Sequence, residues 1–543
     1  MEQRGEVIPR IGAVLAASVR GRLSWPGVGV GGFGFLAVAL LASSSGGYWP
    51  TAWSWTALLC AWVCILALLL VPAAALSRAE QALLAGTVLL LAWIALSATW
   101  SESQPRTLLE VQRTMAYLAL IAAAVVVLRP RSYRALLVGV WAATVVVSTY
   151  SLATRLLPDR LGQFDPIAGY RLFAPLGYWN ALGLFAAFGI TLAVGLAARA
   201  RLRLATPAAL SLLVLAPTLY FTFGRGAWLG LGVGLVVAIL LDPRRLQLLV
   251  VLSVLALCPA LALASAYRSD ALTRSTASLE NAVADGRSLA LLLVGLAVAQ
   301  AGLVLGVRLL EARVHVSARM QSAITRAGAA AVALALVVAV VFLGGPGEVR
   351  DRVRDGFLTT SPSPDLNKRL FSLSSNGRAD LWSLAWDEFE KRPFAGSGAG
   401  TYEIAWLRDR PDGQKVRDAH SLYLESLAEL GIVGTALLVG VLALPLFAVF
   451  AARRRSLVPA AAGVYAAFLV HAAIDWDWEM LSVSAAALLC GLAVLAAARP
   501  VASNPLSRVS AFALGVAMIV VAAFSFLGVV GYGALASAED AAV

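Results

Sequence analysis

The chain carries little charge for its length. Only 14% of its 543 residues are Asp, Glu, Lys or Arg, whereas ordinary soluble domains have roughly 25%. Hydrophobic residues make up 60%, and the mean hydropathy is +0.81. Apolar stretches of about 20 residues, each long enough to cross a bilayer core as a helix, recur throughout. Because lipid offers the backbone no hydrogen-bond partners, this composition excludes a string of soluble domains and predicts an all-α polytopic membrane protein.

Lysine, histidine and cysteine are also scarce. Lysine occurs only at positions 368, 391 and 415, and histidine only at 315, 420 and 471. The four cysteines show no metal-ligand spacing, so we interpret them as small core residues and expect neither a metal nor a cofactor. The net charge of +12 comes from arginine clusters between apolar runs. That pattern is typical of membrane topology and not of nucleic-acid binding.

The apolar runs predict about 12–15 transmembrane helices. Fifteen runs lie at about 27–44, 51–71, 79–98, 114–128, 133–153, 177–197, 204–222, 226–241, 246–266, 288–308, 324–343, 431–450, 456–474, 480–498 and 511–534. The basic clusters fall in alternate connections, which the positive-inside rule places in the cytoplasm. The predicted organisation is a cytoplasmic segment 1–26, transmembrane helices in 27–343, a large extracytoplasmic loop 344–430, further transmembrane helices in 431–534, and an extracytoplasmic tail 535–543.

The large loop shows helical periodicity in its second half. In RADLWSLAWDEFEKRP, at 378–393, Trp382, Trp386 and Phe389 fall on one face of a helix. The following FAGSGAGTY contains three glycines, which indicate turns or close backbone contacts. Most charges of residues 344–375 are expected to form a solvated surface.

A second amphipathic segment, HSLYLESLAELG, ends the loop at 420–431. Its apolar residues can face a core, while Glu425 and Glu429 share another face. We predict that the two amphipathic helices of the loop lie over the mouth of the membrane bundle.

Two arginines lie beside apolar runs on the predicted outer side. Arg171 occurs in GYRLFAPLGYWNALG, before a span that includes Asn180, and Arg225 is flanked by Gly224 and Gly226 in FTFGRGAWLG. An arginine in such a place can simply extend its charged end to the interface. Alternatively, the glycines clear space for a ligand, and the guanidinium fork suits phosphate oxygens. The second interpretation predicts that both arginines bind a diphosphate on a lipid tail.

The histidines are the candidate proton acceptors. Asp418 can cap a helix, which places His420 in the first helical turn, where the helix dipole disfavours imidazolium. A neutral imidazole can then act as a general base for a sugar hydroxyl. The alternative is a histidine packed under the loop. His471 competes with it, because Asp475 lies four residues on and can either orient the imidazole or form a purely structural pair with it.

The remaining polar candidates are weaker. His315 lies in a basic loop that is predicted to be cytoplasmic, and we set it aside. The others are Arg378 and Asp380 at the start of the first loop helix, and Glu102, Arg106 and Arg113 near the third connection.

Several segments, in order along the chain, carry a family resemblance. They are LSATWSESQPRTLLEVQRTMAYL, RLFAPLGYWNALG, FTFGRGAWLGL, GRADLWSLAWDEFEKRPFAGSGAGTYE followed by DAHSLYLESLAELGIVG, and HAAIDWDWEM. Together they resemble the O-antigen ligase and O-antigen polymerase (Wzy-type) family of bacterial envelope glycosyltransferases. Two positions depart from the family pattern: Gly224 stands where serine is usual, and Ser421 stands where asparagine is common. Fifteen spans also exceed the dozen or so that are typical of the family.

The resemblance implies a multi-pass protein of the bacterial cytoplasmic (inner) membrane, with its active site on the extracytoplasmic side. It implies transfer of a glycan from a polyprenyl-diphosphate-linked donor to a lipid or glycan acceptor, with inversion and without a metal. Arg171 and Arg225 would stabilise the diphosphate leaving group, and His420 would activate the acceptor hydroxyl. Replacing His420 with alanine is expected to abolish transfer. The sequence does not separate a ligase from a polymerase.

Two other functions stay open at this point. The first is a secondary transporter or flippase, although few acidic residues lie inside spans and no paired Gly/Pro-interrupted spans indicate inverted repeats. The second is a peptidoglycan-type glycan polymerase, against which the second arginine and the loop histidine argue. Convergence of Arg171, Arg225, His420 and His471 on one outer cavity would favour transfer chemistry, and wide scatter would favour transport.

Overall fold

The chain folds almost entirely into helices. The computed structural model describes residues 25–70, 75–163, 165, 167–313, 320, 323, 326, 345–358, 365–370, 374–411, 413–500 and 505–542. These residues contain helices and no β-strand, which confirms the all-α class. The predicted span 324–343, His315 and nearly all of the predicted segment 1–26 lie outside the described residues.

The helices follow one another with short connections. The first ten elements are α2 (Trp25–Ser43), the 3-10 helix η1 (Ser45–Gly47), α3 (Pro50–Leu70), α4 (Arg78–Ser97), α5 (Gln104–Val127), α6 (Tyr133–Leu156), α7 (Pro158–Leu161), α8 (Trp179–Arg199), α9 (Leu202–Phe221) and α10 (Arg225–Leu241). Next are α11 (Arg245–Leu255), α12 (Leu257–Arg268), α13 (Asp270–Thr273), α14 (Leu279–Arg313), α16 (Gly345–Leu358), α17 (Leu366–Leu370), α18 (Arg378–Lys391) and α19 (Tyr402–Asp409). The last are α20 (Leu422–Ala452), α21 (Val458–His471), the 3-10 helix η2 (Asp477–Glu479), α22 (Leu481–Ala498) and α23 (Arg508–Ala542).

The long helices match the predicted spans. Among the described residues, 11 helices are long and apolar enough to cross a membrane, and three shorter apolar helices accompany them, Gly27–Ser43, Arg225–Leu241 and Val458–His471. Together they account for every predicted span except the one at 324–343. The prediction of a polytopic membrane protein is therefore confirmed.

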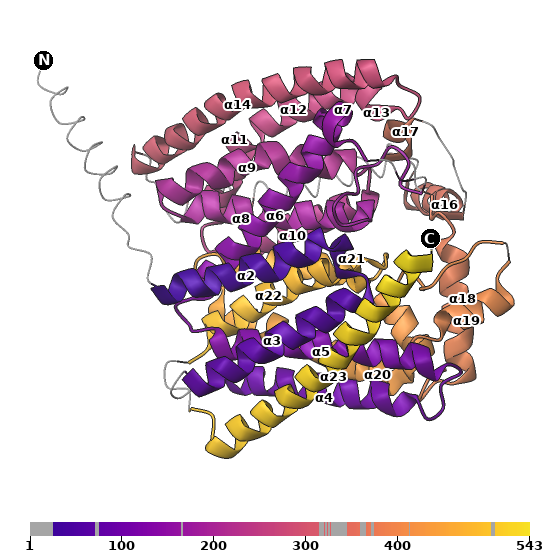
Figure 1. The fold of residues 1–543 in the computed structure, drawn as a ribbon. Coiled ribbons are helices and arrows are strands. Elements are labelled where there is room, and N and C mark those ends of the chain that lie inside the picture. The colour runs from indigo at the N-terminus through magenta and orange to yellow at the C-terminus, as the bar shows by residue number, and fades with distance from the viewer. Residues whose placement is uncertain are drawn as a thin grey trace, which may run out of the picture.

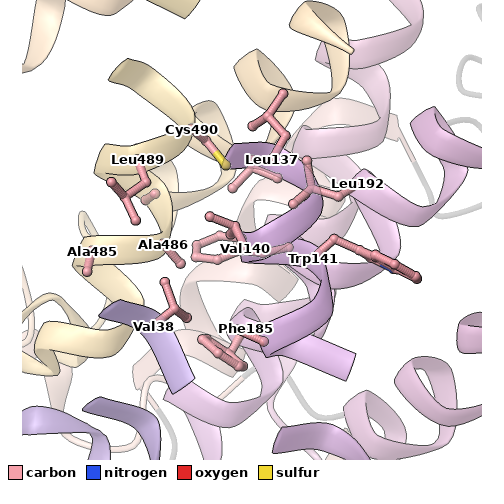
Figure 2. Close-up of a cluster of buried hydrophobic side chains, with 14 of the residues drawn as sticks. Val38, Leu137, Val140, Trp141, Phe185, Leu192, Ala485, Ala486, Leu489 and Cys490 are labelled. Carbon is pink, nitrogen blue, oxygen red and sulfur yellow. The ribbon is translucent and has the colours of Figure 1, made fainter. Parts of the chain in front are cut away.

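The long helices run roughly side by side, and the polar elements α16 to α19 lie together at one end of them (Figure 1). Two helices form the centre of this bundle. The apolar stretch of α8 is 100% buried and that of α22 is 89% buried. Figure 2 shows Val38, Val140, Phe185 and Ala486 meeting there, from α2, α6, α8 and α22. The site described below is built on the ends of these central helices and their neighbours.

Close backbone contact fixes the crossing of α2 and α6. A Cβ atom on Gly139 would lie 2.1 Å from the carbonyl oxygen of Gly31. Small residues allow this approach, and in lipid such packing contributes much of the association between helices.

The ends of α8 and α22 that lie away from the polar elements carry buried ion pairs. Arg199 pairs with Asp242 at 2.5 Å, and Arg499 donates two hydrogen bonds to the Glu80 carboxylate, at 2.6 and 2.9 Å. The side chains of Arg499 and Glu80 are only 2% and 1% exposed. Glu80 also caps α4 together with Ser77, so this pair joins the start of α4 to the end of α22.

Arg499→Ala is expected to lower the free energy of unfolding by about 3–5 kcal/mol, because it leaves the Glu80 carboxylate buried without its charged partner. The measurement is reversible unfolding in mixed micelles, and Arg454→Ala, at an exposed position in a neighbouring turn, is the control. Equal stability of the two variants would contradict a structural role for the pair.

The three glycines between α18 and α19 form turns, as predicted. Gly396, Gly398 and Gly400 have φ of +68°, +106° and +75°. A Cβ on Gly398 would lie 2.5 Å from Ser101, so this turn packs directly against the connection between α4 and α5. These glycines therefore allow the polar segment to pack closely against the membrane bundle.

The aromatic face of α18 is not its buried face. Its buried side chains are Leu381, Leu384, Ala385 and Glu388, and Trp386 is 47% exposed. Aromatic periodicity alone did not show which face packs against α19 and α20. The second predicted amphipathic helix is the first part of α20, which Gly431, with φ of +64°, divides from the longer apolar part.

Candidate functional site

A polar cavity of about 510 Å³ lies at the end of the bundle where the polar elements gather. Three helices begin at its wall, because Trp179, Arg225 and Arg378 are both lining residues and the first residues of α8, α10 and α18. Helix N-termini present partial positive charge and N–H donors. The lining side chains that carry charge, together with the one imidazole, are Arg171, Arg225, Arg378, Asp475 and His420. This arrangement suits an anionic ligand.

The two predicted arginines line the same cavity, and protein contacts hold both of them. Arg171 donates to the carbonyl oxygens of Ala168 and Ile167, at 2.8 and 2.6 Å, and its guanidinium lies 3.4 Å from the ring centroid of Trp179. Arg225 donates to the carbonyl oxygen of Ser374 at 2.7 Å. Backbone carbonyls orient each guanidinium without cancelling its charge, so both contribute positive potential to the cavity.

The glycines beside Arg225 serve a different purpose from the one predicted. A Cβ on Gly226 would lie 2.7 Å from Nε2 of His471, and one on Gly224 would lie 3.0 Å from Oδ1 of Asn180. These two side chains occupy the space that the glycines leave. The glycines therefore allow the start of α10 to pack closely against His471 and Asn180.

Asp475, in the connection between α21 and η2, joins three lining residues. Its carboxylate accepts hydrogen bonds from the Tyr178 hydroxyl at 2.7 Å, from Asn180 at 2.6 Å and from Arg378 at 2.8 Å. Burial raises the pKa of Asp475, but the positive charges of Arg378 and the two nearby histidines outweigh this effect and hold the pKa below its usual value. Asp475 thus stays ionised and fixes the positions of Asn180 and Arg378.

His420 does not lie in a helix, which corrects the sequence prediction. Ser421 caps α20, and His420 precedes it with a left-handed backbone, φ +52°. Its ring Nδ1 lies 2.7 Å from Oδ1 of Asp418. Burial alone lowers the pKa of His420, but the charge and hydrogen bond of Asp418 raise it above the ordinary value. The carboxylate of Asp418, and not a helix dipole, therefore determines the pKa and the orientation of this imidazole.

His471 and Asp380 are placed differently from expectation. His471 is completely buried below the cavity, and its Nδ1 lies 3.1 Å from Asp477, so it does not pair with Asp475. The helix ends at His471, and the turn that follows carries Asp475 off the helix face that the four-residue spacing assumed. Asp380 is exposed on α18 and does not line the cavity.

Trp476 packs against residues that line the cavity, which sequence reasoning did not predict. Its ring stacks on Tyr178 with centroids 4.3 Å apart, and it lies 6.5 Å from the His420 ring and 5.5 Å from the Tyr48 ring. The segment HAAIDWDWEM contains it, but nothing in its spacing indicates three aromatic contacts. The convergence of three helix starts was also not predicted, because it depends on tertiary packing.

Residues 282–439 match the family model described as O-Antigen ligase. This part of the chain is therefore similar to the O-antigen ligase family. The match includes Arg378 and His420 and leaves out Arg171, Arg225 and Asp475. Comparison with curated proteins gives no match.

The O-antigen ligase match confirms the resemblance found in the sequence. Together with the apolar helices, it supports a glycosyltransferase-like enzyme of O-antigen biosynthesis in a multi-pass protein of the inner membrane. The family acts on a lipid-linked glycan and an acceptor. The polar cavity contains the candidate residues for a transfer reaction of this kind.

Proposed function

We propose that the chain transfers a glycan from a polyprenyl-diphosphate-linked donor to the hydroxyl of a lipid or glycan acceptor, as a ligase or as a polymerase. The observation that carries this proposal is that Arg171, Arg225 and His420, three of the four residues named for the convergence test, line one cavity together with Arg378. The fourth, His471, does not line it. The three arginines and His420 are separated by up to 249 positions in the chain, so a random arrangement would scatter them. A scattered arrangement was the outcome that would have favoured transport.

The cavity suits a diphosphate. Three guanidiniums face one carboxylate among its lining residues, and three helix N-termini add partial positive charge. Guanidinium groups bind phosphate oxygens through paired N–H donors. Charge builds on the diphosphate as it leaves, so donors already in place lower the barrier to transfer.

His420 and Asp418 are arranged as a base and its orienting carboxylate. The acceptor oxygen attacks the anomeric carbon, the bond from that carbon to the diphosphate oxygen breaks, and the polyprenyl diphosphate leaves with the electron pair. The acceptor proton passes to Nε2 of His420, since Nδ1 is engaged by Asp418. A single displacement of this kind inverts the anomeric centre.

The position of the cavity supports an extracytoplasmic site. The cavity lies where α8 begins, and the arginine-rich connections predicted to be cytoplasmic follow the other end of that helix, at Arg199, Arg201 and Arg203. The positive-inside rule then assigns the cavity to the opposite side of the membrane.

Transfer is expected to depend on pH through His420. Only the neutral imidazole accepts a proton, so the rate falls as pH falls through the pKa of His420, which lies above 6.5 because of Asp418. Asp475 also raises this pKa, and Arg378 lowers it. Asp418→Asn removes the largest raising contribution, so the acidic limb of the pH–rate profile should move to lower pH. An unmoved limb would show that His420 is not the titrating group.

The direct test uses the purified protein in nanodiscs with a synthetic polyprenyl-diphosphate glycan and a set of candidate acceptors. The expected result is acceptor-dependent release of polyprenyl diphosphate together with a new glycosidic bond. Translocation of the intact donor without release, measured in proteoliposomes, would instead establish a flippase.

A further inference from the structure

A second cavity, of about 570 Å³, lies at the same end of the bundle. Its lining includes Tyr48 and Trp49 just before α3, Trp53 of α3, Arg106 and Arg113 of α5, the last part of α23, and Glu403 and Arg417 of the polar segment. Neither the proposed diphosphate site nor the reacting groups lie in it.

The second cavity differs from the first in its carboxyl and guanidinium groups. Five glutamates and three arginines line it, whereas three arginines and one carboxylate line the first cavity. Each of its arginines is already paired with a carboxylate: Arg106 with Glu403, Arg113 with Glu479 at 2.7 Å, and Arg417 with Glu403 at 3.9 Å. A second phosphate or other anion would therefore find each arginine of this cavity already engaged by a carboxylate.

Aromatic side chains form the open wall of the second cavity. Trp49 is 54% exposed, and Tyr48 beside it accepts a hydrogen bond from Arg417 at 3.2 Å. Aromatic rings offer an apolar face to the C–H groups of a sugar ring, and carboxylates accept hydrogen bonds from its hydroxyls. Aromatic faces beside carboxylates suit an uncharged polyhydroxyl ligand.

The wall between the two cavities is thin. Tyr48 lines the second cavity and contacts Trp476 at 5.5 Å between ring centroids, and Trp476 lies 6.5 Å from the His420 ring that lines the first. Arg417 and His420, three residues apart, belong to different cavities. The segment from Arg417 to His420 thus reaches from the second cavity to the proposed base in the first.

We propose that the second cavity binds uncharged sugar residues of the acceptor glycan and presents the terminal hydroxyl toward His420. This inference rests on the proposed transfer reaction and adds a recognition rule: the bound part of the acceptor is neutral, and its phosphorylated counterparts are rejected. The anionic group of the reaction is confined to the donor, in the first cavity.

The test uses the full-length protein in nanodiscs and an array of immobilised neutral oligosaccharides, each with a phosphorylated counterpart. Wild type is expected to bind neutral members in preference to their phosphorylated forms. Trp49→Ala should weaken this binding about tenfold or more, because it removes an exposed aromatic contact. Trp55→Ala, six residues further along the chain in α3, 47% exposed and outside the cavity, is the matched control and should bind like wild type.

Glu403→Gln supplies a gain of function that a purely structural role would not produce. It removes the carboxylate that pairs with Arg106 and Arg417, so phosphorylated members should bind more tightly than they bind wild type. The inference is overturned if wild type binds no neutral member, if it prefers phosphorylated ones, if Trp49→Ala binds like Trp55→Ala, or if Glu403→Gln leaves phosphorylated binding unchanged.

Binding of polyprenyl diphosphate to the same preparations separates the two proposals. Trp49→Ala should retain wild-type affinity for this lipid, because Trp49 does not line the first cavity. If wild type fails to bind polyprenyl diphosphate, the proposed transfer function fails, whatever the array shows.

Discussion

His420→Asn is expected to reduce glycan transfer by about 10²–10⁴-fold, the usual contribution of a general base. Asparagine is the informative replacement because it tolerates the left-handed backbone at this position, φ +52°, better than alanine does. The loss should appear in kcat, while the affinity for polyprenyl diphosphate stays near wild type, since the arginines that hold the diphosphate are untouched. Initial rates at several donor concentrations measure both quantities.

The matched control for this variant is Lys415→Ala, an exposed position in the same connection that lines neither cavity. It should transfer at the wild-type rate. If His420→Asn folds, inserts and transfers as fast as the control, His420 is not the base. A loss confined to donor affinity would instead make it a binding residue.

Arg225→Ala is expected to lower kcat by about 10²–10³-fold, comparable with the removal of one preorganised donor to a developing negative charge. The kcat of Arg225→Lys should lie between the kcat of wild type and that of Arg225→Ala, because lysine keeps the charge but loses the planar pair of donors. Release of polyprenyl diphosphate from the donor analogue measures the effect. The guanidinium also holds the Ser374 carbonyl, so melting temperatures must accompany the rates.

Arg245→Ala is the control for Arg225. Arg245 is also the first residue of an apolar helix, α11, but it is exposed and outside the cavity. Its loss should leave transfer unchanged. Full activity of Arg225→Ala, with a folded protein, would remove this arginine from diphosphate binding and weaken the proposed function as a whole.

The position of the candidate site was predictable because charged and titratable residues beside apolar runs are rare in this chain. An arginine or histidine beside an apolar run needs a reason to be there, and Arg171, Arg225 and His420 were each singled out on that basis. Their surroundings were not predictable. Asp418 was expected to cap a helix, and its carboxylate instead pairs with the imidazole of His420. Asp475 was expected to pair with His471 and instead holds Asn180 and Arg378.

The same limit applies to Arg106 and Arg113. They were noted only as weaker polar candidates, because Glu403 and Glu479, which pair with them across the fold, are distant in the chain and only the pair of Arg113 with Glu110 is local. Local spacing carries no information about such contacts. The second cavity, which these pairs line, could therefore not have been inferred before the fold was known.

The sequence by itself determined the helices and their apolar character, because lipid leaves a hydrophobic segment of this length no other stable structure. It also determined which rare polar residues need an explanation. Only the tertiary structure decided that three helix starts, three guanidiniums and an imidazole surround one cavity, and that a second, carboxylate-rich cavity lies beside it. The reason is physical: hydropathy acts along a segment, whereas charge pairing and helix-end geometry act between segments that packing brings together.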